Sequence, residues 1–73
     1  LKDRLRRAYD ELSALQVALE NEIKSFDLYR RAAAEADQDA ARQMYTWLAG
    51  AERTHFNMLM ANYETISSEA SWV

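Results

Sequence analysis

The stretch Leu48-Ala-Gly-Ala-Glu52-Arg-Thr-His55-Phe-Asn-Met-Leu59 decides the expected fold. Glu52 and His55 are three residues apart, so a helix places them one above the other on one face. Leu48 and Leu59 share that face and are expected to point into a core. A carboxylate and an imidazole in a core stripe are costly unless a partner satisfies them, and a metal ion binds one atom from each. The stretch therefore predicts a helix that supplies metal ligands to a helical core.

The composition is that of one small helical domain. The chain has 73 residues, 49% hydrophobic and 29% charged, with no Pro and one Gly, which is typical of long helices with few breaks. The absence of Cys excludes a disulfide, a thiolate metal site and a rubredoxin-type iron centre. It is also expected of a reducing compartment, so we predict a cytoplasmic location.

Charge and hydropathy limit the partners. A net charge of −3 argues against nucleic acid as a partner. No apolar run approaches the ~20 residues that span a membrane, and no signal peptide is visible, so we predict no membrane partner. The basic cluster Lys2, Arg4, Arg6 and Arg7 is expected to form a solvated helix face. The first residue is Leu1 rather than Met, so we keep open that the chain is a fragment of a longer protein.

A first helix is expected over about residues 3–36. Its apolar residues recur at alternating spacings of three and four, which is typical of a helix stripe. This first stripe consists of Leu5, Ala8, Leu12, Leu15, Leu19, Glu22, Phe26, Tyr29 and Ala33. Glu22 is its one charged member. Glu20 lies close in sequence but off the stripe, so the heptad phase favours Glu22 as the functional residue.

A second helix is expected over about residues 39–66, with Asp37 or Asp39 as its N-cap residue. Its stripe consists of Ala41, Tyr45, Leu48, Glu52, His55, Leu59 and Ile66. Two further apolar lines, Met44/Trp47/Ala51/Met58 and Phe56/Tyr63, widen this face, so the helix is expected to pack against more than one neighbour. Residues 67–73 are predicted to be a loop with an aromatic anchor at Trp72.

The two stripes mirror each other about Asp37. In a tight antiparallel hairpin, residues equally distant from Asp37 face each other, which pairs Glu22 with Glu52 and Tyr29 with Tyr45. Both glutamates then lie roughly 22 Å from the turn. The tyrosines are expected to pack in the core, although a role as hydrogen-bond donors or redox-active groups stays open.

Two facing glutamates repel each other unless one holds a proton or a cation lies between them. Two hairpins related by a two-fold axis offer four carboxylates and two imidazoles, which is the ligand set of a two-metal site in a four-helix bundle. Glu22, Glu52 and His55 are therefore the predicted metal ligands, and iron, manganese or zinc suits them. We expect a dry apolar cavity beside them, lined by Leu19, Ile23, Phe26 and Leu48.

The motifs Ala18-Leu19-x-x-Glu22, Phe26-x-x-Tyr29 and Leu48-Ala49-x-x-Glu52-x-x-His55-x-x-x-Leu59 resemble the rubrerythrin branch of the ferritin-like di-iron carboxylate superfamily. The resemblance runs from about Leu12 to Trp72, and Asn62-Tyr63-Glu64 with a Trp shortly after is similar to the end of the second repeat in two-repeat members. It implies a four-helix bundle of two hairpins, with Glu22, Glu52 and His55 as half of a di-iron centre and Glu22 or Glu52 as a bridging carboxylate. It also implies reduction of hydrogen peroxide, oxidation of ferrous iron by dioxygen, or iron storage.

The chain departs from that family in three respects. It is half of the usual bundle, so a second copy, giving a homodimer, or a further part of the chain must supply the rest. It lacks the rubredoxin module, so an electron donor would have to be a separate protein. It also lacks the extra glutamate of full rubrerythrins. A competing hypothesis is a metal-free helical module that dimerises, in which the three polar residues form a buried network that sets the register.

Overall fold

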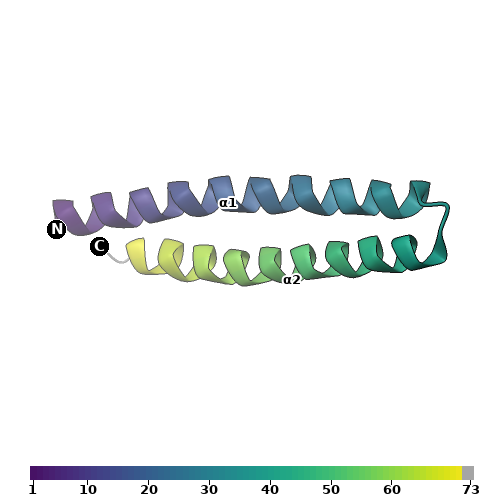
Figure 1. Cartoon of the computed structure of the whole chain (residues 1–73). Helices are drawn as coiled ribbons and strands as arrows, with labels where there is room; N and C mark the ends of the chain where they lie inside the picture. The colour runs from purple at the N-terminus through teal and green to yellow at the C-terminus, as the bar shows by residue number, and fades with distance from the viewer. Residues whose placement is uncertain (72–73) are drawn as a thin grey trace.

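The computed structural model describes residues 1–71, which form two antiparallel α-helices. Helix α1 comprises Lys2–Glu35 and α2 comprises Asp39–Ala70, and they lie side by side with the start of α1 and the end of α2 at one end (Figure 1). The Cα trace measures 56 × 15 × 11 Å, so the molecule is two helices wide and one helix thick. The prediction of an all-α helical hairpin is confirmed.

Helix α1 is uninterrupted because its sequence contains neither Gly nor Pro. Asp3 in the first turn complements the positive end of the helix dipole. The helix ends where Ala36 adopts an extended conformation with φ −69° and ψ 131°, and the Ala36 N–H donates to the Ala33 carbonyl. The predicted end, near residue 36, is therefore close to the observed one.

The start of α2 differs from the prediction. Gln38 occupies the N-cap position, and no side chain of the described residues caps the helix, so the expectation for Asp37 or Asp39 is wrong. Asp39 is instead the first helical residue, where it complements the helix dipole and accepts a hydrogen bond from Arg42 at 2.8 Å. Arg42 also donates to the Ala36 carbonyl at 3.1 Å, so one side chain joins α2 to the end of α1.

The end of α2 also differs, because the helix continues to Ala70 rather than ending near Ile66. Hydroxyl groups in the last turns bond to the helix's own carbonyls: Thr65 donates to Ala61 at 3.0 Å and Ser71 to Ser68 at 2.7 Å. Ile66 and Ala70 are partly covered, and they border a hollow beside the first turns of α1. The aromatic anchor expected at Trp72 lies outside the described residues.

The core is a narrow seam between the two helices. Leu19 and Ala49 are its most buried apolar residues, at 9% and 7% exposure, and most of the other stripe residues are half-buried. The rings of Tyr29 and Tyr45 stack with their centroids 6.5 Å apart, in agreement with the predicted pairing about Asp37. An exposed hydrogen bond of 3.3 Å from Gln16 to Tyr63 also crosses the seam.

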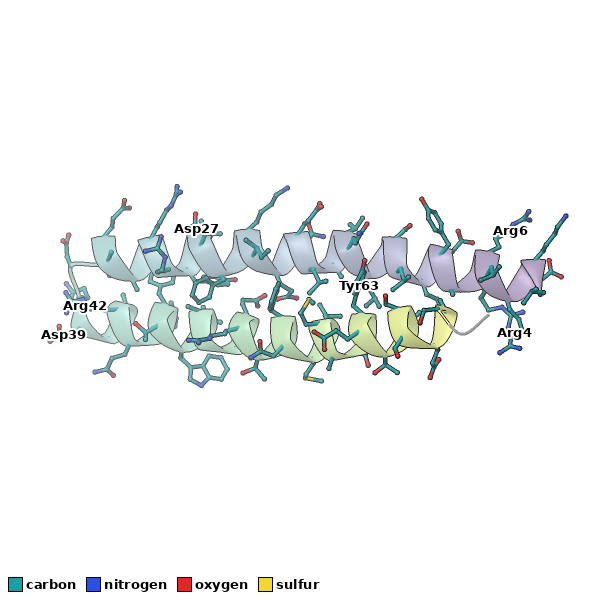
Figure 2. All side chains as sticks on the ribbon, turned by 180° about the vertical axis from the view of Figure 1, so that it is seen from behind. Arg4, Arg6, Asp27, Asp39, Arg42 and Tyr63 are labelled. Atoms are coloured by element: carbon teal, nitrogen blue, oxygen red, sulfur yellow. The ribbon has the colours of Figure 1, made fainter. Side chains whose placement is uncertain are left out.

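Charged side chains off the stripes lie at the surface, and the prediction of a solvated face for the basic cluster is confirmed. Asp27 pairs with Arg30 at 3.0 Å and with Arg31 at 2.9 Å along the outer surface of α1. The basic cluster at the start of the chain is exposed; Arg6 points outward from α1, whereas Arg4 points toward the side of α2 (Figure 2), where it borders a hollow with Glu69. Neither α1 nor α2, as far as they are described, has a stretch long and apolar enough to cross a bilayer.

Candidate metal centre

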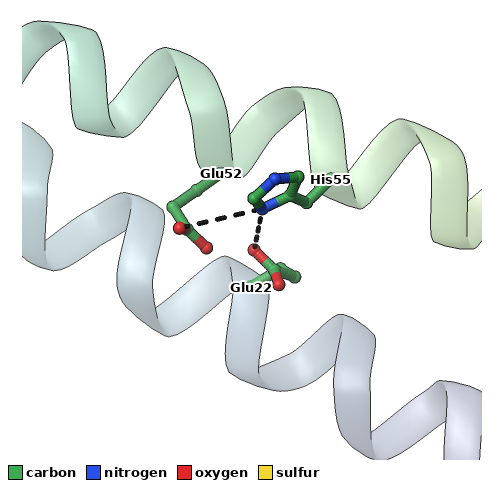
Figure 3. A group of neighbouring side chains, drawn as sticks. All are labelled: Glu22, Glu52 and His55. Carbon is green, nitrogen blue, oxygen red and sulfur yellow. Dashed lines mark ion pairs between the residues drawn. The ribbon is translucent and has the colours of Figure 1, made fainter.

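The three predicted ligands come together at one point of the seam. Glu22 projects from α1, while Glu52 and His55 project from α2 toward it (Figure 3). One ligand atom from each of the three residues lies within 4.8 Å of the other two. Two atoms bound to one ion at about 2.1 Å cannot be more than about 4.2 Å apart, so small side-chain rotations are enough to gather them around a cation.

The imidazole is about equally distant from the two carboxylates. His55 Nδ1 lies 3.8 Å from Glu22 Oε2 and 3.9 Å from Glu52 Oε1. Both distances exceed the range of a hydrogen bond. The imidazole therefore approaches both carboxylates without a hydrogen bond to either.

The three side chains differ in burial. Glu22 and Glu52 are 21% and 18% exposed, whereas His55 is 55% exposed, so the expectation that His55 lies in the core is wrong. The reason is helix geometry: a step of three residues turns the helix by 300°, so His55 is rotated about 60° from Glu52, away from α1. The imidazole therefore stands at the open edge of the cluster.

One carboxylate oxygen is left unsatisfied. Glu22 Oε2 is buried from solvent and has no hydrogen-bond partner among residues 1–71. A buried acceptor without a partner is destabilising, more so when it carries charge. A cation between Glu22, Glu52 and His55 would satisfy it, so the donor set and this oxygen both fit a bound metal ion.

The acid–base state of the cluster agrees with this geometry. The pKa of Glu22 is raised above its ordinary value of 4.5, first because its carboxyl can share a hydrogen bond with Glu52. Partial burial and the negative charge of Glu52 raise this pKa further, and the charge of His55 opposes them. Without a metal, Glu22 therefore retains a proton more readily than an isolated glutamate, and binding of a metal must displace that proton.

A groove of about 310 Å³ leads to the two carboxylates. It is lined by Glu22, Ile23, Phe26, Glu52, Arg53 and Phe56. Of the four residues expected to line a cavity, Ile23 and Phe26 do so, whereas Leu19 is buried in the seam and Leu48 lies elsewhere along it. Arg53 and Phe56 line the groove although neither was among the expected lining residues.

A sequence signal for these two residues did exist. Arg53 and Phe56 follow Glu52 by one and four residues, the spacing at which Ile23 and Phe26 follow Glu22. Residues with equal offsets from the two glutamates lie on the same side of an antiparallel hairpin, because equal rotations about the two helix axes lead to the same face.

Neighbouring polar residues do not join the cluster. Glu20, the rival of Glu22 in sequence, is exposed on α1. Tyr29 and Tyr45 stack on each other nearer the turn, as expected of packing residues. Of the two glutamates, Glu22 is the one that lies beside Glu52 and His55.

Comparisons with known proteins leave the family of this chain open. No protein-family model matches it, and neither the curated proteins nor the solved structures include a match.

Proposed function

We propose that Glu22, Glu52 and His55 form half of a carboxylate-bridged two-metal site of the rubrerythrin or ferritin-like type, completed by a second copy of the chain. The observation that carries this proposal is the buried Glu22 Oε2 without a hydrogen-bond partner, directed at an imidazole and a second carboxylate. The residues that carry the family resemblance are the same residues that meet in space, which supports a shared chemistry.

One hairpin alone offers too few ligands for a two-metal site. Two copies give four carboxylates and two imidazoles, one Glu from each α1 and one Glu-x-x-His from each α2. Iron fits this set of hard oxygen and imidazole ligands, and manganese or zinc is the alternative. A homodimeric four-helix bundle is therefore the assembly in which we expect the site to function.

Each ligand residue has a separate task. Glu22 must lose its proton before it can bind a cation, and its burial keeps water from competing for the same oxygen. Glu52 shares the seam with Glu22, so the two carboxylates would hold a cation together. His55, at the open edge, is placed to bind an ion through Nδ1 as it arrives from solvent.

Bound iron would supply the electrons that reduce peroxide or dioxygen. The apolar groove beside the carboxylates suits the entry of such small neutral oxidants, because Ile23, Phe26 and Phe56 offer no ligand to a hydrated ion. Peroxide reduction would need a separate electron donor, in a reducing compartment such as the cytoplasm. Storage or delivery of iron without turnover would use the same ligands.

The test is the metal content per chain together with the mass in solution, after anaerobic loading with ferrous iron. We expect about one iron per chain in a dimer, with loss of iron in Glu22→Ala. Glu20→Ala is the matched control, because Glu20 is two residues away on the same helix and exposed, and it should retain the metal. Peroxidase and ferroxidase assays on the loaded dimer then separate turnover from storage.

A metal-free interaction module is the second candidate, favoured by the exposed edge position of His55 and by the many exposed apolar residues. In that case Glu22→Ala would leave a dimer of unchanged stability, and neither the natural chain nor Glu20→Ala would retain iron. A metal-free dimer after ferrous loading would overturn the proposal of a metal centre.

A further inference from the structure

An uncharged ridge runs along the outer flank of α2. It is formed by Met44, Trp47, Ala51 and Met58, of which Trp47 is 71% exposed and both methionines are more than half exposed. Trp47 and Ala51 border the same hollow as His55, a depression of about 510 Å³ that Gly50 and Thr54 complete. The ridge is therefore continuous with the open edge of the metal cluster.

The ridge lacks charge, unlike the exposed surface of α1. Between Gln43 and Ala61 the charged residues are Glu52, which belongs to the cluster, and Arg53, which lines the groove beside it. Over the same length, α1 exposes many charged side chains, among them Glu20, Lys24 and Arg31. Depletion of charge with enrichment in Trp and Met is the composition of the centre of a protein–protein interface.

The ridge is symmetric about the height of the cluster. Met44 lies seven residues before Ala51 and Met58 seven residues after it, and Ala51 directly precedes Glu52. A two-fold axis perpendicular to the helix at Ala51 would place Met44 of one copy on Met58 of the other. The small side chain of Ala51 permits close approach at the crossing point, and the self-complementary pattern is that of an isologous contact.

The exposed area supports a second copy as the occupant. A compact monomer of 8.5 kDa is expected to expose about 4,650 Å². This chain exposes 5864 Å², an excess of about 1,200 Å² over that expectation. Each partner in a stable dimer buries about 800 Å², so the excess is enough for one such interface.

We propose that the ridge of Met44, Trp47, Ala51 and Met58 binds the same ridge of a second copy, with α2 antiparallel to α2 and the two-fold axis at Ala51. The contact places His55 of each copy beside the cluster of the other, so the two half-sites meet. This inference rests on the proposed function for its second copy, and it names the surface and the orientation through which that copy binds.

The orientation is tested by cysteine crosslinking in the metal-free protein, because the natural chain contains no Cys. Ala51→Cys places one thiol beside its symmetry mate, so we expect a disulfide-linked dimer on mild oxidation in the presence of a chelator. Asn57→Cys is the control, because Asn57 is an exposed residue of the same helix outside the ridge. This variant should form at least tenfold less disulfide-linked dimer than Ala51→Cys. Equal crosslinking of the two variants would overturn the proposal.

The contribution of the ridge to binding is tested by sedimentation of Trp47→Glu, again with chelator. We expect the dimer dissociation constant to rise at least tenfold, since a charge would be buried against an apolar partner. Tyr9→Glu is the control, because Tyr9 is equally exposed at 71% but lies on α1 far from the ridge. A monomeric natural chain, or a dimer that tolerates Trp47→Glu, would overturn the proposal.

The metal content of the same samples separates the two proposals. If the dimer binds one iron per chain and Trp47→Glu leaves its dissociation constant unchanged, the proposal of the metal centre stands and the proposal of this surface is refuted. A dimer that Trp47→Glu dissociates, and that binds no iron, would retain this surface and refute the metal centre.

Discussion

The two flanks of α2 on either side of Glu52 differ in burial. Ala49, three residues before Glu52, is buried in the seam, whereas His55, three residues after it, is half exposed. Both lie about 60° from Glu52 around the helix, in opposite directions. Equal spacing from one residue thus gives a structural position on one side and a position available to a metal ion or a second copy on the other.

This contrast separates the residues that stabilise the hairpin from those that the proposed function would use. The seam flank, with Leu19 and Ala49, contains the most buried apolar side chains, so it supplies most of the packing within the hairpin. The open flank, with His55 and Trp47, contributes little to the single hairpin but borders the cluster. Substitutions on the seam flank should therefore change mainly the free energy of unfolding, whereas substitutions on the open flank should change mainly binding.

The largest expected effect is from Leu19→Ala, which removes a buried side chain from the seam. We expect it to lower the free energy of unfolding by about 2–4 kcal/mol. Glu20→Ala, at the next and exposed position, should change it by no more than about 0.5 kcal/mol. Thermal unfolding of the metal-free protein at one fixed concentration measures both, and equal melting temperatures would show that the seam is not the stabilising flank.

A neighbouring pair on α2 provides the next contrast. Ala49→Leu should destabilise the protein by about 1–3 kcal/mol, because the seam has no room for the added atoms. Gly50→Ala should stabilise it by about 0.5–1 kcal/mol, since a Cβ there meets no atom within 4 Å and Ala favours the helix. Denaturant midpoints of the two variants should move in opposite directions; a shift in the same direction would contradict the assignment of flanks.

The pH dependence of the metal-free protein tests the cluster itself. Because the pKa of Glu22 is raised in the fold, the folded chain binds this proton more tightly than the unfolded chain does. The resulting stabilisation is fully present below the ordinary pKa of 4.5 and is lost as the pH rises through the raised value. We expect this loss in melting curves of the natural chain and of Glu20→Gln, but not of Glu22→Gln, which has no proton to lose. If the loss of stability with rising pH persists in Glu22→Gln, a titratable group other than Glu22 causes it.

The smallest effect is expected from Tyr63→Phe, which removes the hydrogen bond from Gln16 across the seam. Because this bond is exposed and 3.3 Å long, we expect a change of about 0.5 kcal/mol or less. Urea titration beside Leu19→Ala measures the ratio of the two effects. A cost as large as that of Leu19→Ala would mean that polar pairing, rather than apolar packing, stabilises the seam.

Local physics made much of this protein predictable. The run without Gly or Pro predicted α1 correctly, and the polar cluster at Asp37 located the turn. The heptad phase chose Glu22 over Glu20, and the structure brings Glu22 to Glu52 and His55. These predictions succeeded because helix periodicity alone decides which residues share a face.

The errors concern features that periodicity does not specify. Gln38 rather than Asp37 or Asp39 occupies the N-cap position. The path of the turn determines where α2 begins, and Arg42 contributes to that path by donating to the Ala36 carbonyl. The helix continues to Ala70 rather than ending near Ile66 because neither Gly nor Pro follows Ile66 to end it.

The sequence by itself determined that there are two helices, where they turn, and that two carboxylates and an imidazole lie on their stripes. The tertiary structure alone decided that the side of Glu52 bearing Ala49 enters the seam and that the side bearing His55 remains open. The physical reason is that a stripe with a period near 3.5 residues has two equivalent flanks. The angle at which the partner helix packs determines which flank is buried.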